Sequence, residues 1–406
     1  MEKRAAYYGL AVVTLLNFLN YIDRYIIAAV LPRMQSELGL TNAQAGLLAT
    51  AFLVAYFITS PFFGALGDRL SRTRLMAFGV GAWSLATAAT GMMRNFAQLV
   101  TARSFVGVGE AAYGTISPAL LSDYFPRSQR GRSFAIFYVA IPVGAAVGYL
   151  LGGLIEPAFG WRAAFFVVGL PGILLALSAL TIPDPPRGAT EDAPPSAPES
   201  VWATLRGFLR NAAYGGTVLG YAAYTFAVSG LAFWMPEYLE RVRGLELSSA
   251  NFVVAGVTVI AGLAGTFVGG YLGDFFSGRV KHGQLWLCGF SSVAAIIPTV
   301  LALTVSSSPA YVIWLFVAEM LLFLSTGPVN VAIVNVVPIG ARSMAMAVSI
   351  FVIHLLGDAI SPPIIGALAD FSSLARAVLI VPAAVAISGF LWIATAAGTA
   401  ESPSGY

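Results

Sequence analysis

Twelve predominantly apolar stretches, each longer than 20 residues, follow one another along this chain of 406 residues. The hydrocarbon core of a bilayer is about 30 Å thick, and a helix rising about 1.5 Å per residue crosses it with about 20 apolar residues. The stretches cover residues 8–31, 43–67, 74–94, 97–123, 132–156, 161–182, 213–238, 248–275, 283–305, 309–336, 343–369 and 374–397. We therefore predict an all-α membrane protein with twelve transmembrane helices.

The composition excludes soluble folds and several kinds of chemistry. Hydrophobic residues make up 58% of the chain and charged residues 10%, whereas an average globular protein contains about 25% charged residues. With one cysteine, Cys288, and two distant histidines, His282 and His354, the sequence contains no cysteine cluster or helical metal motif. Neither Lys3 nor Lys281 follows the glycine pattern of an ATP-binding loop. We expect no enzymatic activity, metal or other cofactor.

The basic residues indicate how the helices are oriented. If the N-terminus is inside, fourteen Lys and Arg side chains lie in cytoplasmic segments and six in external segments. Cytoplasmic loops of membrane proteins are enriched in these residues. We therefore predict a multi-pass protein of the inner (cell) membrane with both termini in the cytoplasm. The pI near 9.0 then reflects topology, and no nucleic acid partner is expected.

An internal repeat divides the chain into two halves. The segment 64–74, with the sequence GALGDRLSRTR, is echoed by GYLGDFFSGR at 270–279, after an offset of 206 residues. We predict an N-terminal six-helix bundle at 1–182, a mobile cytoplasmic linker at 183–212 and a C-terminal bundle at 213–406. Within the linker, Trp202 to Arg210 has the pattern of a short amphipathic helix at the membrane surface. Two related halves imply a substrate site near the midplane between them.

These motifs resemble those of the major facilitator superfamily. The segment 64–74 is similar to its G-x-L-x-D-R-x-x-R-R loop, and Arg103-x-x-x-Gly107-x-Gly109-Glu110 is similar to a second signature. Glycines at four-residue spacing in the fifth stretch and Gly160-Trp161-Arg162 also fit. The resemblance implies two pseudo-symmetric bundles, alternating access and a cytoplasmic gate. The gate residues would be Asp68, Arg69, Arg72, Arg74, Asp274 and Arg342, with Phe275 in the second half where the first half has Arg69.

A narrower resemblance is to the Spinster family of lipid transporters. It rests on the segment 17–25 (NFLNYIDRY), on Gly109-Glu110-Ala111 and on the segment 354–362 (HLLGDAISP). The brevity of the chain is typical of a bacterial member. The resemblance implies proton-coupled movement of sphingolipids or lysophospholipids.

Ionisable side chains inside the predicted spans mark the candidate site, because each costs roughly 2.5–3.5 kcal/mol at the bilayer centre. Asp23 and Glu110 both fall near mid-depth, and we predict that they carry protons. Arg24 is their predicted switchable partner, since helix geometry directs Glu110 toward Arg24 or Asp23 rather than toward Arg103. The alternative is a structural ion pair that only fixes helix packing. The remaining candidates for switching or substrate binding are Arg103, Asn20, Tyr25, Tyr113, Glu319, His354 and Asp358.

His354 and Asp358 are four residues apart and could pair on one helical face, for function or for packing. The leading hypothesis is a proton-coupled secondary transporter of an amphipathic, lipid-like substrate, of the lysolipid or sphingolipid class. The alternative substrate is a small organic anion or drug. A membrane receptor or scaffold without a transport cycle is the competing class of protein. The expected partners are the substrate, protons and membrane lipids, and the chain is expected to be monomeric.

Overall fold

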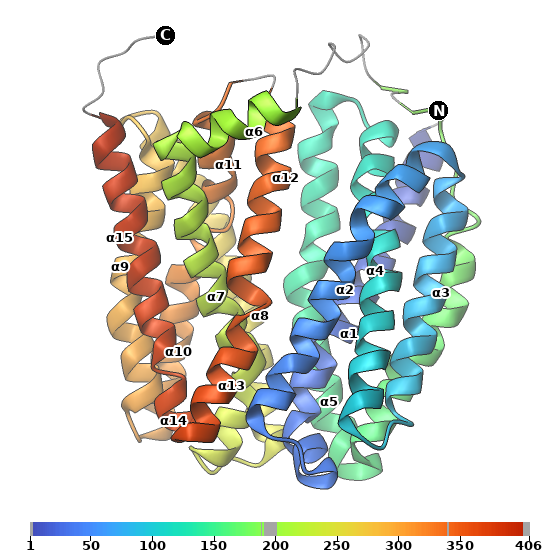
Figure 1. The fold of residues 1–406 in the computed structure, drawn as a ribbon, viewed down its shortest axis with the longest axis vertical. Coiled ribbons are helices and arrows are strands. Elements are labelled where there is room, and N and C mark those ends of the chain that lie inside the picture. Colours follow the sequence, from blue (N-terminus) through green and yellow to red (C-terminus); the bar gives the residue numbers. More distant parts are fainter. Residues whose placement is uncertain (1–2, 188, 191–200, 339–340, 401–406) are drawn as a thin grey trace. The chain divides into compact units, whose positions relative to one another are not determined.

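A computed structural model describes residues 3–187, 189–190, 201–338 and 341–400 of the chain. The described residues form helices and connecting segments, with no strand among them (Figure 1). Two compact units are present, one formed by Met1–Ser196 with Leu239–Ala255 and the other by Ala197–Tyr238 with Gly256–Tyr406. Each unit packs mainly within itself.

Five helical elements make up most of the first unit. They are α1 (Lys3–Leu38), α2 (Asn42–Arg69), α3 (Arg72–Thr90), α4 (Phe96–Tyr124) and α5 (Arg127–Ser178). The element α5 contains two helices that meet at Gly160, whose φ of 77° lies in the left-handed region that favours glycine. The Trp161 indole, next to this break, donates a hydrogen bond to Glu37 at 2.6 Å. The break therefore turns the chain at the end of one membrane crossing and starts the next.

The second unit contains the remaining elements. They are α6 (Val201–Arg210), α7 (Ala212–Arg241), α8 (Leu247–Ser277), α9 (Gly283–Thr304), α10 (Ser308–Phe323), α11 (Pro328–Asn335), α12 (Arg342–Ile353), the π-helix η2 (His354–Asp358), α13 (Ser361–Phe371), α14 (Leu374–Ala377) and α15 (Ile380–Ala400). The last residues of α7 and the first turns of α8 group with the first unit. They are held there by contacts such as Arg33 with Glu240 at 3.1 Å and the Asn251 amide with the Ala29 carbonyl at 2.9 Å.

The prediction of twelve transmembrane helices is confirmed. Nine segments of the described chain are long and apolar enough to cross a membrane. One of them, Ile136–Ser178, contains the two helices that meet at Gly160. The helices α3, with 19 residues, and α4, with 29 residues, complete the twelve.

Two predicted spans in the second half are interrupted near their middle rather than continuous. The span predicted at 309–336 is divided into α10 and α11, and Pro328, which has no N–H to donate, begins the second piece. The span predicted at 343–369 contains η2, closed by a hydrogen bond from the Ala359 N–H to the His354 carbonyl at 3.1 Å. Broken helices and π-turns in transporters commonly mark functional positions. The apolar pattern did not reveal either interruption.

The described first part of the predicted linker at 183–212 makes hydrogen bonds with the helices of the first unit. Arg187 donates hydrogen bonds to the Gly67 and Leu70 carbonyls at 2.5 and 2.7 Å, and the Tyr124 hydroxyl donates to the Pro183 carbonyl at 2.5 Å. The polar composition suggested a solvated linker, but its polar groups bond to the ends of α2 and α4. Residues 191–200 lie outside the described part of the chain. The predicted amphipathic helix is confirmed as α6.

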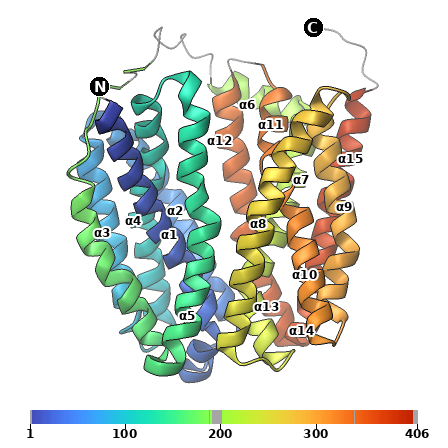
Figure 2. The same cartoon turned by 180° about the vertical axis from the view of Figure 1, so that it is seen from behind.

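Glycines set the close packing of α1 against α5, which run side by side in the first unit (Figure 2). A Cβ on Gly144 would lie 2.8 Å from the Phe18 carbonyl, and one on Gly148 would lie 2.8 Å from the Ile22 carbonyl. A Cβ on Gly152 would fall 2.3 Å from the Ala29 Cβ. The four-residue spacing therefore keeps one face of α5 free of side chains.

We expect Gly148→Ala to lower the free energy of unfolding by about 1–3 kcal/mol, the usual cost of overpacking. The added methyl group would meet a backbone oxygen that cannot rotate away. Unfolding of the purified protein in mixed micelles measures the effect. Gly256→Ala in α8 is the matched control, because its Cβ would meet nothing within 4 Å. The control should be neutral or stabilising, by up to about 1 kcal/mol. Equal effects of the two substitutions would contradict this account.

Candidate functional site

Four charged side chains of α1 and α4 come together inside the first unit. The Arg24 Nε lies 2.8 Å from Glu110 Oε2 and donates a hydrogen bond to it. Arg103 Nη1 lies 3.8 Å from Asp23 Oδ1. Thr87 of α3 donates its hydroxyl to the other oxygen of Asp23. The structure therefore brings together the two predicted proton carriers and both predicted arginines, and it confirms the contact of Glu110 with Arg24.

This cluster is almost completely withdrawn from solvent. The side chains of Glu110, Asp23 and Arg103 are 0%, 1% and 3% exposed, whereas that of Arg24 is 22% exposed. Taking isolated charges out of water costs several kcal/mol each, and the pairing of two acids with two bases offsets part of that cost. Arg24 is the member of the cluster with substantial access from outside.

The cluster is incompletely hydrogen-bonded. Among the described residues, Glu110 Oε1, Asp23 Oδ1 and Arg103 Nε have no hydrogen-bond partner. Buried polar atoms without partners are rare in proteins and are costly where they occur. A proton on either carboxylate would convert an unsatisfied oxygen into a donor.

Aromatic rings surround Arg24, and the sequence analysis did not predict them as site residues. The guanidinium carbon lies 5.1, 5.0 and 5.4 Å from the ring centres of Tyr21, Phe52 and Tyr56. Arg103 also lies 5.0 Å from the Phe52 ring centre. Such cation–π contacts stabilise a guanidinium that has left water. Phe52 therefore contacts both arginines of the cluster.

Thr87 was also missed, although a signal was present. Ser84, Thr87 and Thr90 repeat at three-residue spacing within an apolar helix, and all three side chains are buried. Small hydroxyl side chains on one helical face can hydrogen-bond across to a neighbouring helix. This pattern could have indicated a polar contact between α3 and α1.

The other predicted members of the first unit have different surroundings. The Asn20 side chain is buried beside Glu110, but its Nδ2 makes no hydrogen bond to any described residue. The Tyr25 ring packs edge-on against Tyr149 at 5.3 Å. The Tyr113 hydroxyl donates to the Val13 carbonyl at 2.6 Å, and its ring packs against a tryptophan of α3. These contacts give Tyr113 a role in helix packing rather than in the charged cluster.

The second unit contains two further groups of predicted site residues. His354 Nδ1 lies 2.7 Å from Asp358 Oδ2, so the predicted pairing of these residues is confirmed. They are at the ends of η2, a π-turn rather than the regular helix that was expected. Glu319 in α10 lies beside Thr258 of α8, and its Oε2 is buried with no hydrogen-bond partner among the described residues.

The predicted gate residues of the first half divide into two groups. Arg72 is buried and bonds to Asp123 at 2.5 Å, to Asp184 at 2.8 Å and to the Pro185 carbonyl at 2.5 Å. These three partners of Arg72 all belong to the first unit. Arg69 and Arg74 are exposed. The side chains of Asp68 and Arg342 lie outside the described part of the structure.

The repeated loop in the second half is built differently. Arg279 lies 3.5 Å from the Phe275 ring centre and donates to the Phe275 carbonyl. Phe275 therefore serves as a platform for Arg279, and Asp274 is exposed beside it. Burial, together with the charge of Lys281, lowers the pKa of His282 in the loop between α8 and α9. His282 is therefore neutral at pH 7, and the arginine and lysine carry the charge of this loop.

Comparison with known proteins identifies the family. The Major Facilitator Superfamily profile matches residues 13–357. Human protein spinster homolog 1 is 37% identical over 385 residues, which cover 89% of this chain and 72% of the human protein. The chain belongs to the Spinster family. The Xenopus tropicalis sphingosine-1-phosphate transporter SPNS2 is 30% identical over 425 residues, covering 97% of this chain and 82% of that protein.

The fold of this Spinster-family member is also that of a solved relative. The crystal structure of a bacterial homolog of the human lysosomal transporter Spinster, inward-facing and unoccupied, superposes with a TM-score of 0.90 over 100% of both chains, at 22% identity. The protein is thus a multi-pass membrane transporter with the major facilitator fold. The resemblance seen in the sequence motifs is confirmed.

Proposed function

We propose that this Spinster-family member is a proton-coupled secondary transporter that works by alternating access and moves a lipid-like substrate with an anionic head group. The observation that supports this most strongly is the contact of Arg24 with the fully buried Glu110. A carboxylate at this position needs its guanidinium partner only while it is ionised. Protonation of Glu110 therefore weakens its hold on Arg24.

The exposure of Arg24 connects the proton to the substrate. Arg24 is the cluster member that is reached from outside, and a planar guanidinium binds phosphate or carboxylate through paired hydrogen bonds. Once Glu110 is protonated, Arg24 is free to bind such a group. The surrounding rings of Tyr21, Phe52 and Tyr56 offer apolar faces for the adjoining carbon chain. Proton binding and head-group binding then favour each other.

The substrate class follows from this chemistry together with the relatives. One relative is named as a transporter of sphingosine-1-phosphate, which has a phosphate head and a single long chain. We propose a single-chain phospholipid or phosphosphingolipid for this protein. Within the second unit, Glu319, His354 and Asp358 remain proposed switching or substrate-binding residues. The gate residues and the monomeric state are also part of the proposal, as is an inner-membrane location with both termini in the cytoplasm.

Uptake into proteoliposomes tests this function. Labelled sphingosine-1-phosphate and lysophosphatidylglycerol are compared with benzoate, a small organic anion, with and without a pH gradient of one unit. Coupling to one proton supports up to about tenfold accumulation for each pH unit, and a protonophore should abolish it. Accumulation of benzoate alone would replace the lipid assignment with the organic-anion alternative. Lipid uptake that is indifferent to the gradient would overturn proton coupling.

A further inference from the structure

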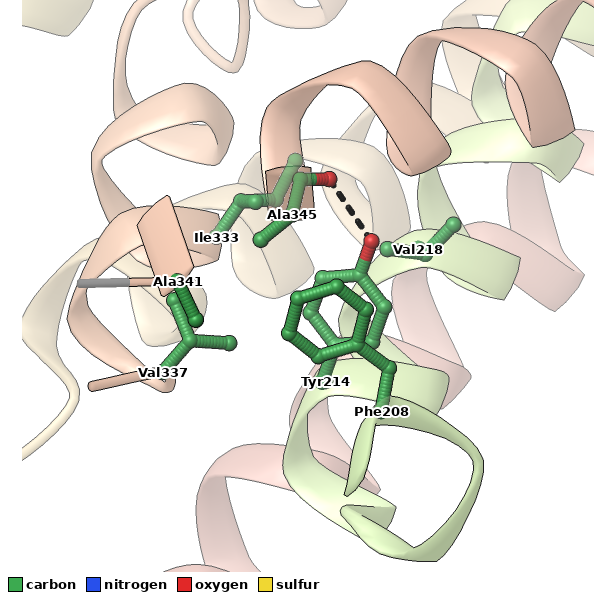
Figure 3. Packing of buried hydrophobic residues seen from close by; sticks show 7 residues of the cluster. All are labelled: Phe208, Tyr214, Val218, Ile333, Val337, Ala341 and Ala345. Atoms are coloured by element: carbon green, nitrogen blue, oxygen red, sulfur yellow. Dashed lines mark hydrogen bonds between the residues drawn. The ribbon is translucent and has the colours of Figure 1, made fainter. Parts of the chain in front are cut away.

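The short helix α6 is fixed to the second unit through one of its faces. Phe208, which is 6% exposed, stacks on Tyr214 of α7 with ring centres 4.7 Å apart (Figure 3). The Tyr214 hydroxyl donates to the Ala345 carbonyl of α12 at 2.7 Å. Asn211, between α6 and α7, donates to the Val336 carbonyl at 2.7 Å. The position of α6 is thus set by the cluster of Phe208, Tyr214, Val218, Ile333, Val337, Ala341 and Ala345.

Another face of α6 exposes large apolar side chains. Trp202 is 79% exposed and Leu209 is 90% exposed. Arg206 and Arg210 are also exposed and lie one turn apart on the adjoining face. Figure 1 shows α6 lying across the end of α7 rather than continuing it. In a membrane protein, a short helix with these two faces is suited to the boundary between head groups and acyl chains.

An apolar groove of about 680 Å³ lies between this helix and the membrane helices next to it. Its volume is within the range of about 300–1,000 Å³ typical of small-molecule sites. Trp202, Leu205 and Leu209 of α6, Val218 of α7 and Val352 of α12 contribute to its wall. Arg206 supplies the charge among the lining side chains. The groove is therefore apolar along its length and positive at α6.

We propose that this groove binds one anionic phospholipid of the cytoplasmic leaflet, with an acyl chain in the groove and the phosphate on Arg206. The proposal uses the orientation assigned by the Lys and Arg count, which places α6 on the cytoplasmic side. An acyl chain entering the groove from the surrounding bilayer would cover the exposed side chains of Trp202 and Leu209. A negatively charged head group matches the two arginines, and the cytoplasmic leaflet is the one rich in anionic lipid.

This lipid site differs from the proposed transport site in its residues and in its role. It involves none of the charged residues of α1 and α4, and its lipid is retained rather than carried across the membrane. The lipid would add to the contacts that hold α6, which follows the segment joining the two halves of the sequence. If the transport proposal fails, the lipid-site proposal is unaffected. If the lipid-site proposal fails, the transport proposal is unaffected.

Native mass spectrometry of the full chain with defined lipids tests the proposal. Phosphatidylglycerol and phosphatidylcholine with the same acyl chains are the two probes. We expect one tightly retained phosphatidylglycerol per protein. Gly215→Leu should lower its affinity about tenfold or more, because Gly215 lines the groove and a Cβ there meets nothing within 4 Å. The new side chain would therefore fill the groove without disturbing the fold.

Two further variants separate the chain contact from the head-group contact. Arg206→Ala should weaken phosphatidylglycerol binding about fivefold, which corresponds to the roughly 1 kcal/mol contributed by one basic residue near an anionic surface. It should weaken phosphatidylcholine binding less, because the choline ammonium neutralises the charge of that lipid's phosphate. Gly398→Leu at the end of α15, where a Cβ also meets nothing within 4 Å, is the matched control and should bind lipid as the unmodified protein does. Unchanged retention of phosphatidylglycerol by Gly215→Leu would contradict the assignment of the acyl chain to this groove. Equal binding of the two lipids by the unmodified protein would overturn the anionic assignment.

Discussion

Glu110→Gln should abolish the pH dependence of substrate binding while the protein remains folded. Glutamine has the shape of a protonated glutamate and cannot release a proton, so the variant corresponds permanently to the acid form. Arg24 would then lack an ionised carboxylate partner at Glu110 at every pH. It would keep its solvent access and its contacts with the rings of Phe52 and Tyr56. In the unmodified protein, head-group binding should strengthen as the pH falls. In the variant it should be strong and constant.

The measurement is the affinity for a single-chain phospholipid between about pH 4 and pH 9, followed by uptake driven by a pH gradient. Gradient-driven uptake should be lost in Glu110→Gln, whereas exchange of substrate across the membrane should persist. Glu156→Gln is the matched control, because Glu156 also pairs with an arginine, Arg33, at 3.1 Å, but outside the buried cluster. It should retain the full pH response.

Asp23 should act together with Glu110, because the charges of both acids are balanced within one cluster. Neighbouring acids that interact strongly titrate as a pair rather than separately. Asp23→Asn should therefore weaken the pH response, and the double variant should show none. If the double variant titrates like the unmodified protein, protons are carried elsewhere, and His354 with Asp358 becomes the next pair to replace.

Sequence patterns predicted the membrane fold well because the bilayer imposes a simple length requirement. Twelve apolar stretches correspond to twelve helices, and Gly144, Gly148 and Gly152 correctly indicated close packing, seen in the structure between α1 and α5. Hydropathy cannot report a change in hydrogen-bond register, because such a change alters no side chain. The π-turn at His354–Asp358 was missed for this reason.

The charged core of the site was predictable because ionised residues in a membrane helix need a partner. Helix depth and side-chain direction reduced the predicted partners of Glu110 to Arg24 and Asp23, and the structure shows the contact with Arg24. Thr87 carried a signal in its spacing with Ser84 and Thr90, but Phe52 and Tyr56 carried none, since an aromatic residue is unremarkable in any membrane span. Their contacts with the two arginines come from the packing of α2 against α1 and α4, which no local pattern encodes.

Arg72→Met should destabilise the first unit by about 3–5 kcal/mol, the usual cost of removing one partner from a buried ion pair. The Arg72 side chain is 4% exposed and pairs with both Asp123 and Asp184. Methionine fills similar space but leaves both carboxylates without their guanidinium. Because these contacts lie within one unit, we expect the substitution to lower the stability of that unit. This effect does not depend on whether Arg72 is part of a cytoplasmic gate.

The same substitution should release the segment that follows the last helix of the first half. Asp184 accepts from the Arg72 backbone and side chain, and this holds the segment in which Arg187 bonds to the Gly67 and Leu70 carbonyls. Trypsin should therefore cut after Arg187 faster in Arg72→Met than in the unmodified protein, and mass spectrometry identifies the peptide. Arg74→Met, in the same first turn of α3 but exposed, should change stability by less than about 0.5 kcal/mol and leave this cleavage rate unchanged. If the two variants unfold at the same temperature and are cut at the same rate, the buried network does not stabilise the unit.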